Sequence, residues 1–138
     1  QYHVVITNPP YHNKFNPSLK DFAKGEYPDS KSDLFSMFIE RNLELVREQG
    51  YVAMITMHAW MFLSSHEKLR NKLLDNATIL SMAHLGPRAF DTIGGEVVST
   101  TAFVLGNFNR PEYRGAYVRL VDGATEAEKA QMFLEAIQ

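Results

Sequence analysis

The feature that most constrains this chain is VVITNPPYHNKF, at residues 4–15. Residues 2–7 are rich in β-branched side chains and predict a strand. Neither Pro9 nor Pro10 can donate a backbone hydrogen bond, and each moves the residue before it out of the helical region. We therefore expect a buried strand that ends in a stiff, extended turn, which directs the Asn8 side chain and nearby carbonyl groups beyond the sheet.

The composition is that of one ordinary globular domain. The chain has 138 residues, of which 45% are hydrophobic and 22% are charged. Its apolar runs are too short to cross a bilayer, and the absence of cysteine excludes disulfide and thiol sites. A formal net charge of -2 gives no overall attraction to nucleic acid. We expect a cytoplasmic protein, and the spacing of its histidines predicts no metal site.

The spacing of apolar residues predicts the first elements after this turn. Polar residues 12–32 predict a long loop. The next segment predicts a helix that is capped by Ser30 or Ser32 and ends at Gly50. Residues 51–56 form a nearly continuous apolar run, which is typical of a strand covered on both faces.

The second half of the chain predicts two helices and two strands. Ser64 and Glu67 have capping-box spacing, which predicts the start of a helix. Residues 79–85 and 97–105 predict strands, and residues 125–137 predict a last helix with one apolar face. No helix separates the last two strands, so we expect them to be antiparallel neighbours.

This order of elements predicts an α/β fold with a mostly parallel sheet, helices on its faces and one reversed strand. In such sheets ligands bind beyond the carboxyl ends of the strands. Three connections should therefore meet at one rim of the sheet, at residues 8–11, 57–60 and 86–90. Trp60 is expected to pack in the core rather than to serve this rim.

The turn at residues 8–11 offers two hydrogen-bond acceptors. The side-chain amide oxygen of Asn8 and the backbone carbonyl of Pro9 could accept both hydrogens of a planar amino group, such as the exocyclic amine of adenine. Tyr11 could stack on the base, and such stacking contributes roughly 1–3 kcal/mol per base. The structural alternative is a turn that only ends the strand, with Tyr11 packed locally.

Asn8-Pro9-Pro10-Tyr11 after a hydrophobic strand resembles the catalytic motif of N6-adenine DNA methyltransferases. Residues 31–56 and the reversed strand at residues 100–105 follow that family's order. Residues 27–62, with YPDSKSDLF and MHAWMFLSS, are similar to the adenine methyltransferase of BREX phage-resistance systems and to the methylase part of fused restriction-modification enzymes. The resemblance covers most of residues 2–106.

The resemblance implies a Rossmann-like class I methyltransferase fold that transfers a methyl group from S-adenosylmethionine to a flipped adenine in DNA. Asn8, Pro9, Pro10 and Tyr11 would be the catalytic residues, with Tyr11 also holding the base. Phe90 would hold the base as well, although an ordinary core role for Phe90 stays open. Other subunits or domains of a restriction or phage-defence system are expected partners.

The resemblance also implies where the cofactor binds. In the family its main loops precede the catalytic motif, so only Asp33, Leu34 and Phe35 are expected to line the far side of that pocket. We therefore expect residues 1–138 to be the C-terminal half of a catalytic domain, cut from a longer protein and inactive alone. Residues 107–138 show little resemblance and are expected to begin a following segment.

Two other interpretations stay open at this point. The same motif serves methyltransferases that act on guanine in ribosomal RNA or on a glutamine amide in a protein. The chain could also be a non-catalytic module that binds nucleic acid or assembles a defence complex, in which the turn is only architecture. Only an enzyme would lose its function on replacement of Asn8.

Overall fold

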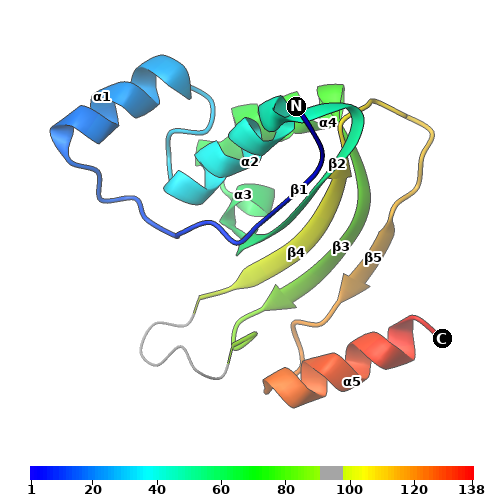
Figure 1. The fold of residues 1–138 in the computed structure, drawn as a ribbon. Helices are drawn as coiled ribbons and strands as arrows, with labels where there is room; N and C mark the ends of the chain where they lie inside the picture. Colours follow the sequence, from blue (N-terminus) through cyan, green and yellow to red (C-terminus); the bar gives the residue numbers. More distant parts are fainter. Residues whose placement is uncertain (91–97) are drawn as a thin grey trace.

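The computed structural model describes residues 1–90 and 98–138. Five strands form one sheet in the order β1-β2-β4-β3-β5, as Figure 1 shows. The elements in chain order are β1 (Tyr2–Thr7), α1 (Pro17–Glu26), α2 (Leu34–Leu45), β2 (Val46–Met57), α3 (Ala59–Phe62), the 3₁₀ helix η1 (Ser64–His66), α4 (Glu67–Asn76), β3 (Thr78–Gly86), β4 (Thr100–Gly106), β5 (Ala116–Arg119) and α5 (Glu126–Ala136).

The sheet is mixed, because four of its strands point the same way and β4 is reversed, and this arrangement confirms the predicted α/β class. β1 runs parallel to β2 and β3 runs parallel to β5. The reversed strand β4 lies between β2 and β3 and is antiparallel to both, so the prediction that β3 and β4 are antiparallel neighbours is confirmed. β5 was not predicted, because a four-residue strand leaves little apolar periodicity. It pairs with β3, so part of residues 107–138 joins the same sheet.

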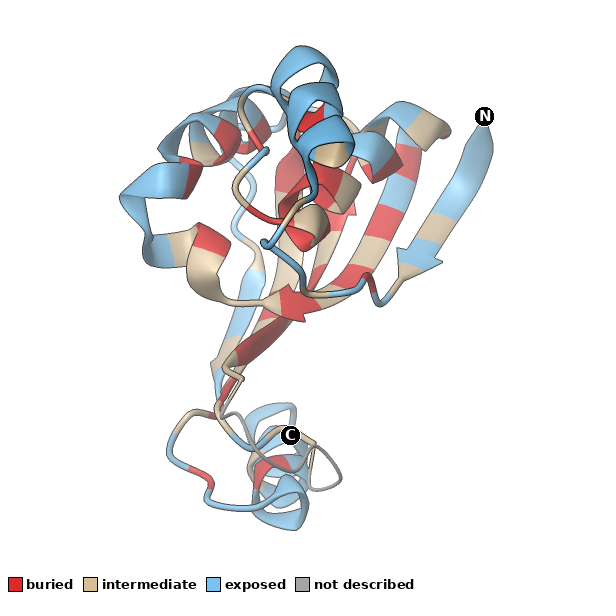
Figure 2. Cartoon of the chain, turned by 90° about the vertical axis from the view of Figure 1, so that its left-hand side faces the viewer, coloured by how far each residue is buried: buried red, intermediate tan, exposed pale blue. Residues whose placement is uncertain are grey.

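The core lies between the sheet and the helices that cover one of its faces. Val52 and Met54 point to this face and are buried together with the apolar sides of α2 and α4. Figure 2 shows the buried residues in the middle of the sheet and on the helices next to it. Ala53 and Ile55 point to the opposite face, where they line an apolar pocket with Phe133 of α5.

β1 is much less buried than the sequence predicts. Tyr2, Val4 and Ile6 are 62%, 50% and 76% exposed, and only Val5 among the aliphatic residues of this strand packs against the core. The reason is position, because β1 lies at the edge of the sheet and pairs only with β2. The predicted burial of this strand is therefore wrong for the described residues.

The predicted loop at residues 12–32 contains the helix α1. The Asn16 side chain accepts a hydrogen bond from the Leu19 amide at 2.9 Å, and Pro17 occupies the first turn. Both are ordinary start signals of a helix, so the sequence held the information that an amphipathic helix begins here. The helix was not predicted because its composition is polar, which matches the finding that Ala23 is the one fully buried residue of α1.

The junction of α2 and β2 also differs from the prediction. Asp33 caps α2, rather than Ser30 or Ser32, and its carboxylate is favoured at the positive end of the helix. α2 ends at Leu45 and β2 begins at the next residue. Gly50 lies within β2, so the prediction that it ends the helix is wrong. The glycine is required by packing instead of by a helix end.

Replacement of Gly50 by alanine is expected to lower the free energy of unfolding by about 1–3 kcal/mol. A Cβ atom at Gly50 would lie 2.6 Å from Cγ2 of Val46 and 2.7 Å from the backbone oxygen of His3, which cannot move without disturbing the pairing of β1 and β2. Gly25→Ala is the matched control, because nothing lies within 4 Å of its added Cβ. Denaturant unfolding of both variants should give changes of opposite sign, since alanine favours the helix around Gly25.

Two further segments differ from their predicted structure. The predicted capping box is wrong, because Ser64 and Glu67 form a 3₁₀ turn and no side chain caps α4. The predicted strand at residues 97–105 is observed as β4 from Thr100, and residue 97 lies outside the described residues. Among the described residues, no helix has the length and apolar character needed to span a membrane.

Candidate functional site

The carboxyl ends of β1, β2 and β3 lie at one rim of the sheet, because these strands point the same way. The segment of residues 8–11, which we call the NPPY turn, follows β1 directly. Asn8 and Pro10 are exposed, whereas Pro9 is buried. The structure therefore anchors the turn through Pro9 and leaves the Asn8 amide accessible.

Tyr11, the last residue of the NPPY turn, packs against the core. Its side chain is half-buried against the core, and its ring meets Phe35 edge-on, with centroids 6.1 Å apart and an interplanar angle of 85°. Burial raises the pKa of Tyr11, so its hydroxyl stays neutral at physiological pH. The ring is thus held by apolar contacts and forms a rigid aromatic wall of the turn. Its contact with a base stays a prediction.

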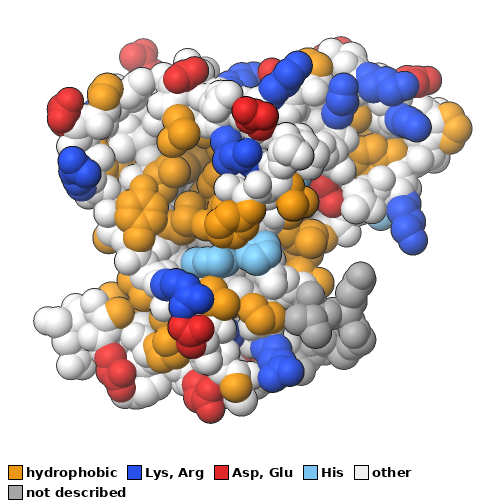
Figure 3. Space-filling view, turned by 180° about the vertical axis from the view of Figure 1, so that it is seen from behind, with side chains coloured by type: hydrophobic (Ala, Val, Ile, Leu, Met, Phe, Trp, Pro, Cys, Tyr) orange, Lys and Arg blue, Asp and Glu red, His pale blue; other side chains and the backbone are white. Residues whose placement is uncertain are grey.

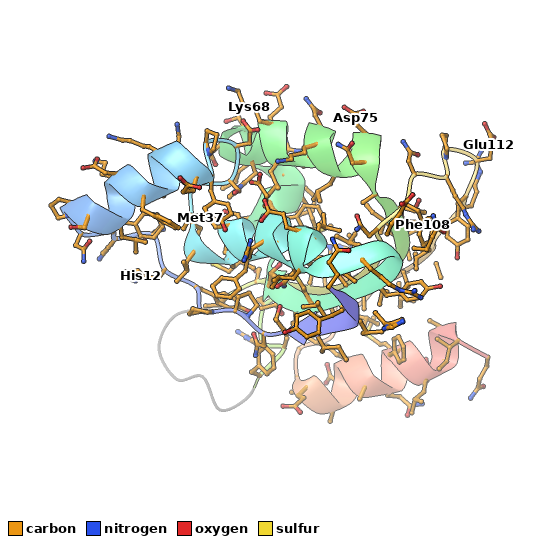
Figure 4. All side chains as sticks on the ribbon, turned by 45° about the horizontal axis from the view of Figure 1, so that its top comes forward. His12, Met37, Lys68, Asp75, Phe108 and Glu112 are labelled. Carbon is orange, nitrogen blue, oxygen red and sulfur yellow. The ribbon has the colours of Figure 1, made fainter. Side chains whose placement is uncertain are left out.

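The first turn of α2 holds the chain just after the NPPY turn. The Asp33 carboxylate accepts hydrogen bonds from the amides of His12, at 3.0 Å, and Phe35, at 3.3 Å. The Leu34 amide donates to the backbone oxygen of His12 at 2.9 Å. Figure 4 shows His12 on the segment that leads from β1 towards α1.

These contacts bear on the residues expected at the cofactor pocket. Asp33 is 7% exposed and Phe35 is 1% exposed, whereas Leu34 is half-buried. The Asp33 carboxylate already serves two backbone amides, and the Phe35 ring belongs to the core. Of the three, Leu34 retains the most accessible surface. A direct contact of these residues with cofactor stays a prediction.

Two aromatic residues at the rim have different environments. Trp60 is 3% exposed and its ring lies 5.1 Å from that of Phe103, so the predicted packing role is confirmed. Phe90 follows β3 and is half-buried. Its role against a base stays a prediction.

A pair of histidines at the same rim was not predicted as a unit. Nδ1 of His58 lies 2.8 Å from Nε2 of His84, and the exposed ring of Phe62 lies 5.3 Å and 5.6 Å from the two imidazoles. Figure 3, which views the molecule from behind, shows histidine and hydrophobic side chains gathered in the middle of the visible surface. His58 lies in the connection at residues 57–60 that was predicted at the rim, but no spacing in the sequence could reveal its contact with His84, 26 positions away.

Acid is expected to destabilise the fold through this pair. Burial lowers the pKa of both His58 and His84, and the neighbouring His58, Arg119 and Lys129 lower that of His84 further. A depressed pKa in the folded state means that the stabilisation is complete above about pH 6.5 and is lost as the pH falls through the folded value.

Denaturant unfolding at pH 7.5 and pH 5.5 measures this effect. The free energy of unfolding should be lower at pH 5.5, and the difference should shrink in His84→Gln, which removes one titrating ring. An unchanged difference in this variant would assign the acid sensitivity to other groups. Within residues 1–90 and 98–138, no cluster of three or more His, Asp or Glu side chains could hold a metal ion.

The chain is similar to proteins of restriction-modification and related systems. Residues 1–90 match the family described as Eco57I restriction-modification methylase. The chain is 50% identical over 131 residues to "Adenine-specific methyltransferase BrxX" of Escherichia coli O9:H4 (strain HS), which covers 94% of this chain and 11% of that protein. The chain thus spans about a ninth of the length of this curated relative.

Solved structures show the same fold at low sequence identity. The methyltransferase subunit of a type I restriction-modification system from Streptococcus thermophilus has a TM-score of 0.67 at 18% identity, over 98% of this chain and 31% of that chain. The Type ISP restriction-modification enzyme LlaGI, in complex with a DNA substrate mimic, has a TM-score of 0.66 at 17% identity, over 96% of this chain and 16% of that chain. These likenesses confirm the Rossmann-like class I methyltransferase fold. With its matching sequence and this fold, the chain belongs to the Eco57I restriction-modification methylase family.

Proposed function

We propose that this chain is part of an adenine-N6 DNA methyltransferase of the restriction-modification or phage-defence type. The observation that carries the proposal is the NPPY turn at the carboxyl end of β1, with Asn8 exposed and Pro9 buried. The adenine-specific methyltransferase named above, at 50% identity, supports adenine as the target. On this proposal, residues 1–138 supply the C-terminal half of a catalytic domain, and residues 107–138 lead into a following segment.

The residues of the turn would act on the acceptor amine. The Asn8 amide oxygen and the Pro9 carbonyl accept its two hydrogens, which draws the nitrogen lone pair out of conjugation with the ring. S-adenosylmethionine, when bound, supplies an electrophilic methyl group. The part of the turn would be to hold the amine nitrogen with its lone pair free to accept that methyl group, after which the nitrogen would release one proton. No covalent enzyme intermediate is required.

Tyr11 and Phe90 would hold the flipped base in this position. The Tyr11 ring is already fixed against Phe35, so stacking on it costs little side-chain entropy. Its neutral hydroxyl adds no charge beside the amine that must become nucleophilic. Phe90 lies after β3 at the same rim and would contact the base from another side.

The described residues fit the acceptor side of this reaction better than the cofactor side. Asp33 and Phe35 are buried and already engaged, so they leave Leu34 as the main surface for cofactor contact. We propose that S-adenosylmethionine is held mainly by other parts of the protein, and that residues 1–138 alone do not methylate. The Asp33 carboxylate would act indirectly, by fixing the segment that follows the turn.

DNA is the proposed substrate, and further subunits or domains of a restriction or defence system are proposed partners. The structure of LlaGI with a DNA substrate mimic supports DNA, because it shares this fold. Because the net charge is -2, the chain as a whole does not attract DNA. Local groups of basic residues, or other parts of the protein, would therefore contact the phosphates. The rim around the NPPY turn is where the base would enter.

Methyl transfer by a protein of the relatives' length that contains this chain tests the proposal. Labelled S-adenosylmethionine is supplied with mixed-sequence DNA, with RNA or with protein in separate reactions, and the digested products are read by mass spectrometry. N6-methyladenine in the DNA is the expected product. Methylated guanine in RNA or methylated glutamine in protein would keep the chemistry and overturn the substrate. Cofactor binding without product on any substrate would favour a non-catalytic module.

A further inference from the structure

We propose that Asn42 is a positioning residue for the catalytic turn, and that it acts through Thr7. The inference deepens the proposed function and rests on it, because it assumes that Asn8 polarises the acceptor amine. Asn42 lies on α2 and belongs to none of the residues expected to contact substrate or cofactor.

The contact between Asn42 and Thr7 joins two segments that lie 35 positions apart. Nδ2 of Asn42 donates to the Thr7 hydroxyl at 2.7 Å and lies 3.4 Å from the sulfur of Met54. Asn42 is 1% exposed, so its amide has little access to water. A buried donor without a partner costs about 1–3 kcal/mol, which strongly favours this one arrangement of the two side chains.

Thr7 is the last residue of β1 and directly precedes Asn8. Successive side chains of a strand point to opposite faces. Thr7 therefore points towards α2, where it meets Asn42, while the next residue, Asn8, is exposed just beyond the end of the strand. A hydrogen bond that fixes the Thr7 side chain also fixes the peptide between the two residues, and with it the direction in which the Asn8 amide leaves the backbone.

The same helix also holds His12, the residue that follows the NPPY turn. Asp33, which caps α2, binds the His12 amide, and Asn42, near the end of α2, binds Thr7. The nine-residue step from Asp33 to Asn42 spans about 14 Å of helix at 1.5 Å per residue. The five-residue step from Thr7 to His12 reaches at most about 17 Å when extended. α2 thus contacts this segment at both of its ends.

Misplacement of Asn8 should lower the rate of the chemical step more than binding. A shift of about 1 Å in a catalytic group can cost up to about 10²-fold in rate. We expect Asn42→Leu and Thr7→Val, which remove the hydrogen bond at nearly constant volume, each to lower the single-turnover rate of methyl transfer about tenfold or more. The dissociation constant of S-adenosylmethionine should change less than twofold, because neither side chain is expected at the cofactor.

The double variant tests whether the two residues act as one unit. If Asn42 acts through Thr7, Asn42→Leu combined with Thr7→Val should be no slower than the slower single variant. Thr7→Ser keeps the hydroxyl and should recover most of the rate. Multiplied losses in the double variant, or a Thr7→Ser as slow as Thr7→Val, would overturn the inference.

Asn107→Leu is the matched control for general damage to α2. Asn107 donates to the backbone oxygens of Leu43, Val46 and Arg47, so it braces the end of the same helix without touching the turn. We expect Asn107→Leu to lower the melting temperature without slowing single-turnover transfer by folded protein. Equal slowing by Asn107→Leu and Asn42→Leu would show that loss of helix stability suffices, and would overturn the inference.

The assay uses the same full-length protein as the test of function, and the two failures are distinguishable. Absence of methylated product from the unaltered protein would contradict the proposed function. An active protein that loses activity in Asn8→Ala but keeps its rate in Asn42→Leu would leave the function standing and reject the positioning role. Cofactor binding and thermal unfolding, measured on every variant, identify any that fails to fold.

Discussion

Asn8→Ala is expected to reduce methyl transfer by at least about 10²–10³-fold, the loss typical of removing one preorganised polar group from an active site. Asn8 is exposed at the end of β1, where its amide oxygen can accept a hydrogen from the acceptor amine. Alanine leaves the Pro9 carbonyl as a single acceptor, so the lone pair of the amine remains conjugated with the ring. Single-turnover kinetics with labelled S-adenosylmethionine and DNA measure the loss.

The loss should affect the chemical step alone. Because Asn8 is exposed and lies in a turn that Pro9 anchors, the variant should fold and bind cofactor like the unaltered protein. Asn13→Ala replaces another exposed asparagine five positions along the chain and should keep full activity. An Asn8→Ala enzyme as fast as Asn13→Ala would contradict the proposed role of the turn, and would favour its interpretation as architecture.

Phe35→Ala is expected to lower the free energy of unfolding by about 3–5 kcal/mol, as is usual when a buried phenylalanine is truncated. Phe35 is 1% exposed and belongs to the core, where its ring contacts those of Tyr11 and His66. The change leaves a cavity directly under the aromatic wall of the site. Denaturant unfolding measures the loss, and Phe35→Leu should recover much of it by refilling the space.

This variant also separates two roles for Phe35. Phe22→Ala is the control, because Phe22 is 52% exposed on α1 and should lose far less stability. If Phe35 served mainly as a wall of the cofactor pocket, Phe35→Ala would weaken binding of S-adenosylmethionine while unfolding stayed close to that of Phe22→Ala. That outcome would contradict the core role which its burial indicates.

The sequence was most informative where local chemistry decides conformation. Consecutive prolines end a strand in almost any context, so the turn after Thr7 was predictable from Pro9 and Pro10 alone. The apolar spacing of α2 and the compact run at residues 51–56 likewise predicted a helix followed by a strand, although the observed strand already begins at Val46. The α/β class followed from their order, because parallel strands need crossover connections.

The sequence was least informative where position in the sheet decides burial. Val4 and Ile6 have the composition of a buried strand, yet they are 50% and 76% exposed because β1 is an edge strand. On α5, Phe133 belongs to the predicted apolar face but is 38% exposed. Lys129 is buried instead, since its ammonium donates to the backbone oxygens of Leu85 and Leu120.

The candidate chemistry is predictable from residues 8 and 9 alone, since the acceptors of Asn8 and Pro9 and the stiffness of their turn are local properties. How that turn is held depends on contacts that form only in the folded chain. Asn42 meets Thr7 across 35 positions, and His58 meets His84 across 26. Such contacts depend on which strands pair and which helix covers them, because burial forces polar groups to find whatever partner the fold brings near.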